Sequence, residues 1–335
     1  MQFRRRWIAA VMLMAAGMAV GAQALPASAV GVNLAQAAHD LETLKPEQAP
    51  SIKDDIVKGA KGLEVAALND YAKAVCEAME PLLASKKQST AINAMMAIVE
   101  LKALDTDATL ERAVGNANPA VRYWAVKGLG ADGIMPRVRD VGGGTLGNAV
   151  AALNKQMKVE TSIIIQMQII KALVSAEDTA ALAEGLSSLS EKWVDAAPDT
   201  TMLATATAGI DKLKELVSGK KLNEKVELAA LTAMGHLMSL AAQHELAKTT
   251  NDGPVPAADH AALVLLMKSG AAMGAEIAKV ELKPTFGFRE VPKESMEIDQ
   301  LYLMVNDLAG SPNVPGDLQK SFPKVALPPA IKSNK

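Results

Sequence analysis

The residues of this sequence that could do chemistry begin with a glycine-rich stretch. VGGGTLGNAV, residues 141–150, has the G-x-G-x-x-G spacing of a turn that binds dinucleotides. Such a turn follows a buried strand and needs an acidic residue about 20 positions further on, at a strand end. Only the four residues VRDV precede it here, within a helical sequence. We therefore interpret the stretch as a flexible loop between helices.

Histidine, cysteine and aspartate are the other residue types that could form a site. The histidines show no i, i+4 pair and no H-E-x-x-H motif, and one cysteine cannot complete a tetrahedral zinc site with them. Cys76 lies in a helical pattern, which favours a buried structural thiol over a nucleophile. Asp105 and Asp107 lack the rest of a calcium loop, so helix capping explains them better. We interpret the histidines as surface or packing residues; they are His39, His236, His244 and His260.

These observations predict no catalytic residue, no metal site and no cofactor, so the chain is not expected to be an enzyme. Composition also narrows the class of partner. A chain with 3% aromatic residues and a net charge of -2 lacks the basic surface and the stacking residues of a nucleic-acid binder. A single cysteine allows no internal disulfide, so packing alone must hold the chain together.

The N-terminus has the layout of a secretory signal peptide over residues 1–24. Three arginines precede the apolar stretch WIAAVMLMAAGMAVG, and small residues suited to cleavage follow. Cleavage is expected near Ala24 or Ala29, which predicts a periplasmic or secreted protein. Removing the three arginines leaves 32 Lys+Arg against 37 Asp+Glu, a net charge of -5. The alternative is an uncleaved membrane anchor, because the apolar stretch is nearly long enough to span a bilayer.

The elements that position these residues are predicted to be helices. Apolar residues recur three and four positions apart between helix breakers, and alternating strand patterns are absent. The chain is therefore predicted to be all-α. Helices are expected over 63–79, 87–103, 106–114, 118–129, 145–157, 162–175, 178–194, 200–217, 223–247, 259–280 and 294–308.

One helical segment recurs along the chain. NPAVRYWAVKGLG, residues 118–130, aligns without gaps with NEKVELAALTAMG at 223–235, and weaker copies lie at 162–174 and 87–99. Both strong copies begin with asparagine, which suits a helix N-cap, and end in glycine. The spacing between copies is unequal, which predicts irregular units.

Aligning the copies identifies the buried face of each helix. Val121, Ala125 and Leu129 lie on one face, and their counterparts are nearly all apolar. The position of Gly128 holds only glycine or alanine, as close helix packing requires. At about 100° per residue, Arg122 falls inside the apolar arc. Its guanidinium must therefore be hydrogen-bonded or paired, because burying it bare is costly.

Residues 105–133, DTDATLERAVGNANPAVRYWAVKGLGADG, resemble a bacterial HEAT repeat. In that family a short helix, an Asp/Asn-Pro-x-Val-Arg turn and an Ala-rich second helix form one unit. The resemblance implies an all-α, armadillo-like α-solenoid, in which the arginine links neighbouring repeats through an acidic or carbonyl partner. Asn118, Pro119 and Val121 match the turn, and Arg122 matches the linking arginine.

The other copies depart from the family at the arginine position, and the partner of Arg122 stays open. Asp105 and Asp107 are the candidates by proximity in the sequence, which does not choose between them. The residues that replace the arginine are Gln166, Glu227 and Ala91.

The domain organisation follows from these units. A short, irregular solenoid of HEAT-like helix pairs is predicted over 63–282, preceded by a lead-in or cap over 25–62. A C-terminal capping helix is expected within 283–310. Residues 311–335 contain five prolines and no helical period, which predicts a disordered tail. A polyproline-type peptide that docks on a partner is the alternative for this tail.

The resemblance implies a protein–protein interaction scaffold, since the second helices of HEAT units commonly line a surface on which another protein lies. The solvent-facing positions of two such helices hold Trp124, Lys127, Gln168 and Lys171, and we predict that they bind a protein partner. Trp124 is either the anchor of that surface or a cover for the adjacent helix edge. Some HEAT-like proteins resemble bilin lyases, so a cofactor-handling or lyase-like protein is the alternative. A membrane partner is expected only if the N-terminal segment stays uncleaved.

Overall fold

The computed structural model describes residues 32–253, 255–281 and 287–332, and within these ranges it contains fifteen α-helices and no β-strand. The prediction of an all-α chain is confirmed for this part of the protein. The predicted signal peptide, residues 1–24, and the candidate cleavage site at Ala29 lie outside the described residues.

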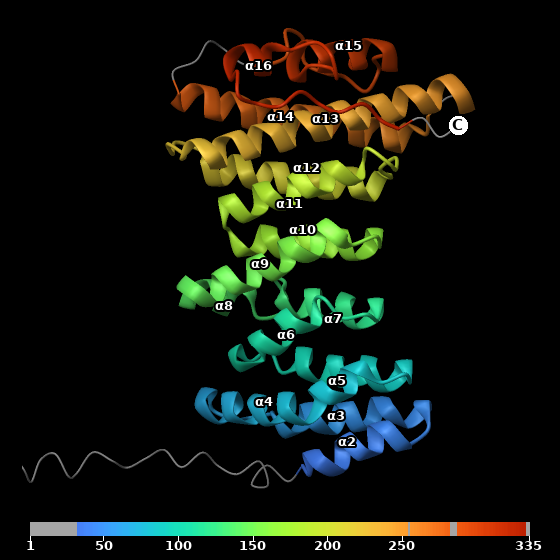
Figure 1. Ribbon diagram of the computed structural model, residues 1–335, viewed down its shortest axis with the longest axis vertical. Helices are drawn as coiled ribbons and strands as arrows, with labels where there is room; N and C mark the ends of the chain where they lie inside the picture. The colour runs from blue at the N-terminus through green and yellow to red at the C-terminus, as the bar shows by residue number, and fades with distance from the viewer. Residues whose placement is uncertain (1–31, 254, 282–286, 333–335) are drawn as a thin grey trace, which may run out of the picture.

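The helices stack in chain order along the longest axis of the molecule (Figure 1). They form two rows in which successive members pack on each other, with the 3-10 turn Leu104–Thr106 helping to connect α4 with α6. The first row contains α2 (Leu34–Thr43), α4 (Val65–Met79), α6 (Asp107–Ala113), α9 (Gly143–Val159), α11 (Thr179–Lys192), α13 (Glu224–Asp252) and α15 (Ile298–Ala309). The second row contains α3 (Ala49–Gly59), α5 (Gln88–Glu100), α7 (Pro119–Leu129), α10 (Ile163–Ala176), α12 (Thr200–Val217) and α14 (Ala257–Val280).

In the two strong copies of the repeated segment, α7 and α13, a side chain caps free backbone N–H groups at the helix start. The Asn118 side chain accepts a hydrogen bond from the N–H of Ala120 at 3.0 Å, and Pro119 occupies the first helical position of α7. Asn223 caps α13 in the same way, accepting from Val226 at 3.0 Å. The shared asparagine of the two strong copies therefore has the predicted capping role.

The predicted small-residue position is a point of close helix contact. A Cβ added to Gly128 would lie 2.8 Å from Val99 and 3.0 Å from Leu110, closer than side chains pack. Its counterparts Ala97, Ala172 and Ala233 are almost fully buried. Small residues here let the helices of the two rows approach each other.

The glycine-rich stretch is not the flexible loop that its composition predicts. Helix α8 (Met135–Val141) includes the VRDV residues and is separated from α9 by Gly142 alone. Gly142 and Gly143 have φ values of 65° and 54°, a backbone conformation that glycine adopts without strain. The chain therefore turns within one or two residues and continues as a helix.

Residues 25–62, predicted only as a lead-in or cap, contain two helices wherever they are described. Leu41 of α2 and Ile56 of α3 are buried, and Tyr71 of α4 donates a hydrogen bond to the carbonyl of Ile56 at 2.8 Å. Helices α2 and α3 thus begin the two rows.

The prediction of a disordered tail is wrong for the described residues 311–332. They contain α16 (Asp317–Ser321), and residues 322–332 then lie along α13 (Figure 1). Phe322 and Val325 are 5% and 4% exposed. Proline content and the absence of a helical period describe an extended chain, but they do not distinguish a free segment from one that packs against a helix. We call residues 322–332 the C-terminal strap.

Helix α14 is long and apolar enough, by length and composition, to span a membrane. Half of its most apolar window is buried inside the protein, and the helix packs against α12 and α13. Leu263, Leu266 and Met267 have no exposed surface. Its hydropathy is thus accounted for by its place in the core.

Candidate functional site

The junction between α7 and α10 contains the buried arginine that the sequence singled out. Arg122 Nε lies 2.7 Å from Glu160 Oε2, and Nη2 lies 3.0 Å from Oε1, so the pair is bidentate. Nη1 also donates to the carbonyls of Asn116 and Ala117. The side chains of Arg122 and Glu160 are 15% and 0% exposed, so the predicted burial and pairing are confirmed.

The predicted partners of Arg122 are wrong: neither Asp105 nor Asp107 contacts it in the described structure. Asp107 lies in the first turn of α6, where it accepts from the N–H of Ala108 at 2.6 Å. Glu160, 38 positions after Arg122, belongs to the turn between α9 and α10. Proximity in the sequence therefore pointed to the preceding turn, whereas the contact is made with the following helix pair.

Both carboxylate oxygens of Glu160 accept hydrogen bonds. It accepts from Gln156 Nε2 and from the backbone N–H groups of Thr161 and Ser162, in addition to Arg122. Burial opposes ionisation of this carboxyl, but the hydrogen bonds from Arg122, Ser162 and Gln156 outweigh burial and lower its pKa to about 2. The ion pair thus fixes α7 against the turn that starts α10.

Three of the four predicted interaction residues line one groove. Lys127 of α7 and Gln168 and Lys171 of α10 border a groove of about 670 Å³ that reaches the first half of α12. The other lining residues are Tyr123, Gly130, Ala131, Asp132, Ile170, Ala172, Val174, Ser175, Thr201, Ala204, Thr205 and Ala208.

Trp124, the fourth predicted residue, lies beside the groove. Its ring meets Tyr123 edge to face, with centroids 5.7 Å apart, and Lys127 Nζ lies 4.6 Å from its ring centroid. Trp124 is half-buried and packs against the core. It therefore covers neighbouring side chains and also holds the Lys127 ammonium at the edge of the groove.

The groove carries a local excess of positive charge. Neither Lys127 nor Lys171 has a carboxylate within ion-pair distance among the described residues. Elsewhere in the two rows, Lys158 and Lys212 are paired with Glu184 and with Glu177 and Glu215, respectively. Asp132 is the acidic residue that lines this groove.

The sequence did not predict the part of the groove that comes from α12. Thr201, Ala204 and Ala208 are exposed and recur three and four positions apart, so they lie on one helix face. This face of small residues is the signal that could have identified them. Tyr123 of α7 is half-buried and also lines the groove.

The remaining candidates for chemistry have packing roles. Cys76 is 6% exposed, and burial raises the pKa of its thiol to about 11, so the predicted structural thiol is confirmed. His244 Nε2 lies 2.5 Å from the Trp193 carbonyl, and His260 Nδ1 lies 2.5 Å from Glu245. Burial lowers the pKa of His244, whereas it raises that of Glu245.

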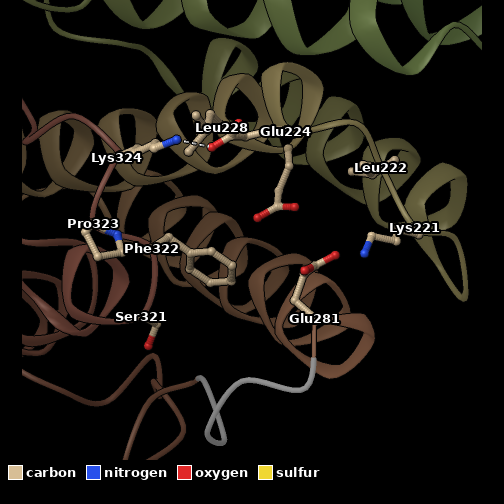
Figure 2. Close-up of a pocket in the computed structure, with 10 residues that line it drawn as sticks. Lys221, Leu222, Glu224, Leu228, Glu281, Ser321, Phe322, Pro323 and Lys324 are labelled. Carbon is tan, nitrogen blue, oxygen red and sulfur yellow. Dashed lines mark hydrogen bonds and ion pairs between the residues drawn. The ribbon is translucent and has the colours of Figure 1, made fainter.

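A second pocket, of about 410 Å³, lies between the start of α13, the end of α14 and the strap (Figure 2). Lys221, Glu281 and Phe322 surround its opening, while Lys324 Nζ lies 2.5 Å from Glu224. Its wall carries charges of both signs, and the strap supplies one side of it. None of its residues was predicted as part of a site.

No protein-family model matches this chain, and no curated protein matches it significantly. The resemblance of residues 105–133 to a HEAT repeat therefore stays a prediction. The function must be sought in the geometry of the α7–α10 junction and of the groove beside it.

Proposed function

We propose that this protein is an exported, non-enzymatic scaffold that binds another protein in the groove between α7, α10 and α12. Its architecture would be a short, irregular α-solenoid of HEAT-like helix pairs, armadillo-like in type. Two features support this architecture. Each row continues from one helix pair to the next, and Arg122 of one pair reaches both a carboxylate and carbonyl groups, as the linking arginine of HEAT repeats does.

The observation that carries the proposed function is the convergence of the predicted interaction residues. Lys127 lies 41 positions before Gln168 in the sequence, yet both border one groove with Lys171. The groove has a half-buried tryptophan at its edge and two lysines without carboxylate partners among the described residues. Small residues of α12 form its remaining wall. Such a mixture of an aromatic anchor and charged edge residues is suited to a protein surface.

Photo-crosslinking in the native envelope would test the groove directly. We expect p-benzoylphenylalanine at Gln168 to form a discrete adduct with another protein, and the same group at Ala180 to form none. Ala180 is an exposed residue of α11, in the other row, and serves as the matched control. Adding Trp124→Ala and Lys127→Glu should abolish the Gln168 adduct while the helical circular dichroism stays unchanged. Equal adducts from both positions, or an adduct from Ala180 alone, would contradict the proposal.

Export is a separate part of the proposal and has its own test. N-terminal sequencing of the protein from its native source should give a chain that begins at Leu25 or Val30, which corresponds to cleavage after Ala24 or Ala29. A chain that retains residues 1–24 and sediments with membranes would instead support the membrane-anchored form of the scaffold.

A further inference from the structure

Resting on the proposed function, we propose that the partner of the groove is an extended, acidic segment of another protein that lies along α10. An apolar residue of this segment contacts the start of α10, and carboxylates about three residues away contact Lys171 and Lys127. The apolar surface, the charges and the hydrogen-bonding groups along α10 each contribute to this assignment.

One line of side chains runs along the exposed face of α10. Ile164, Gln168, Lys171 and Ser175 are spaced four, three and four positions apart, so they lie on one side of the helix. The eleven residue steps correspond to roughly 16 Å along the axis. An extended peptide of about five residues covers that length, and about three residues cover the seven steps from Ile164 to Lys171.

The N-terminal end of this line is apolar. Ile164 is 62% exposed, and the neighbouring Ile163 and Val159 are 46% and 68% exposed. The other exposed large apolar residues in the described ranges occur singly along the sequence. Three exposed β-branched residues within six positions, at the end of α9 and the start of α10, indicate a contact with another molecule.

The other end of the line is basic, and its charges are available to a ligand. The bidentate pair with Glu160 neutralises Arg122, but no carboxylate in the described part of the chain lies within ion-pair distance of Lys127 or Lys171. The Trp124 ring holds the Lys127 ammonium in place, so less side-chain freedom is lost when an anion binds. Carboxylates of a partner would form charge-assisted hydrogen bonds with both lysines.

A hydroxyl group on α10 suits the wall of the groove to a peptide backbone. Ser175 lines the groove and donates its own hydroxyl hydrogen to the carbonyl of Ala172, whereas Thr205 is only 6% exposed. The Ser175 oxygen can still accept, so it can meet a backbone N–H group of an extended segment. Asp132 lies in the same groove and disfavours carboxylates placed beside it.

Selection from a random twelve-residue peptide library, displayed against the full mature chain, tests this inference. Counter-selection uses the Lys127→Glu/Lys171→Glu double variant. We expect enriched peptides to carry an apolar residue and, about three positions away, two or more carboxylates. Enrichment of basic or uncharged peptides, or no enrichment over the counter-selected pool, would overturn the inference.

A labelled peptide with one leucine and two glutamates at that spacing gives a quantitative measurement by fluorescence anisotropy. The double variant should bind it roughly tenfold more weakly, whereas Lys155→Glu should leave binding unchanged. Lys155 is an exposed lysine of α9, away from the groove lining. A peptide with lysines in place of the glutamates should prefer the double variant. Equal binding to Lys155→Glu and to the double variant would refute the charge assignment.

The crosslink at Gln168 distinguishes a failure of this inference from a failure of the proposed function. If that adduct persists while acidic peptides fail to bind, the groove is a protein interface of different chemistry, and only this inference is lost. If the adduct is also missing, the proposed function fails as well.

Discussion

The middle and the C-terminal end of this protein are held together by different kinds of interaction. In the middle, the side chains of Arg122 and Glu160 form one buried ion pair between α7 and the start of α10. At the C-terminal end, the strap lies along α13, and the Gln243 side chain bonds to its backbone at Pro329 and Ile331. The middle thus depends on two specific side chains, whereas the end depends on an extended main chain and a few apolar contacts.

This difference determines how far a local change should spread. In stacked helix pairs, stability is the sum of each unit and its contacts with neighbours. Loss of the ion pair weakens the contact between α7 and α10, and further helices of the stack lie before α7 and after α10. Loss of the strap affects α13 and also Val194, just after α11, whose carbonyl accepts from the N–H of Lys332. The changes below test this contrast, from the largest expected effect to the smallest.

Truncation after Ser321, which removes the strap, should have the largest effect. Phe322 and Val325 are buried, and burial of such side chains contributes about 1.5–3 kcal/mol each. We therefore expect a loss of roughly 3–6 kcal/mol, confined to the end of the stack. Hydrogen exchange should accelerate in α13 and α15 and stay unchanged in α7 and α10.

Leu327→Ser is the matched control for the truncation, because Leu327 belongs to the strap but is 37% exposed. It should leave exchange in α13 nearly unchanged. Unaltered exchange in α13 after truncation would mean that the strap contributes no stability, and acceleration throughout the chain would remove the contrast between the two regions.

Arg122→Ala should cost about 2–4 kcal/mol in the free energy of unfolding, since it leaves the Glu160 carboxylate buried without its cation. Arg112→Ala is the control: Arg112 also forms a bidentate pair, with Glu80, but the two side chains are 59% and 37% exposed. We expect its loss to stay below about 1 kcal/mol. Urea unfolding of both variants measures the difference, and similar losses would show that burial of the pair does not matter.

The two regions also differ in what the sequence could reveal. The ion pair has a local signature, because an arginine inside an apolar helix arc must have a partner, and Arg122 has one. The identity of that partner depends on which helix pair packs next to α7. Glu160 is brought there by the turn after α9, and nothing within the repeat specifies its position.

The strap has no comparable signature. The helices between 63 and 308, apart from the short α8, were predictable because their buried faces repeat every three to four residues. The strap instead buries every third residue, Phe322, Val325 and Pro328, which is the period of an extended polyproline-type segment and not of a helix. Its partner, α13, begins 98 residues earlier at Glu224. The groove was predictable on α7 and α10, where the repeats align, and not on α12, which no copy covers.

The ion pair should also make stability depend on acid. The pKa of Glu160 is lowered to about 2 in the folded protein from an ordinary value of 4.5, so the carboxylate stabilises the fold at pH values above 4.5. This contribution, roughly 3 kcal/mol, should be lost as the pH falls from about 4.5 to 2.

Urea unfolding at pH 7, 4 and 3 measures the acid effect, with the Arg122→Ala variant as reference. The difference in unfolding free energy between the native chain and the variant should shrink as the pH falls. A constant difference over this range would show that the carboxyl titrates normally and that its hydrogen bonds are weaker than the geometry indicates.

Gln243→Ala should have the smallest measurable effect. Gln243 Nε2 donates to the Pro329 carbonyl, and its Oε1 accepts from the N–H of Ile331, each at 3.1 Å. Losing two such bonds should cost about 1–2 kcal/mol at the end of the stack. Lys324→Ala, which removes an ion pair whose side chains are 70% and 66% exposed, should cost much less.

Gln243→Glu then separates the two hydrogen bonds. The glutamate still accepts from the Ile331 N–H but no longer donates to Pro329, and its charge is held against a carbonyl oxygen. Hydrogen exchange at Ile331 and in α13 should therefore be at least as fast in Gln243→Glu as in Gln243→Ala. If Gln243→Glu exchanges like the native chain, the donor to Pro329 is dispensable, and the strap is held by its apolar contacts rather than by recognition of its backbone.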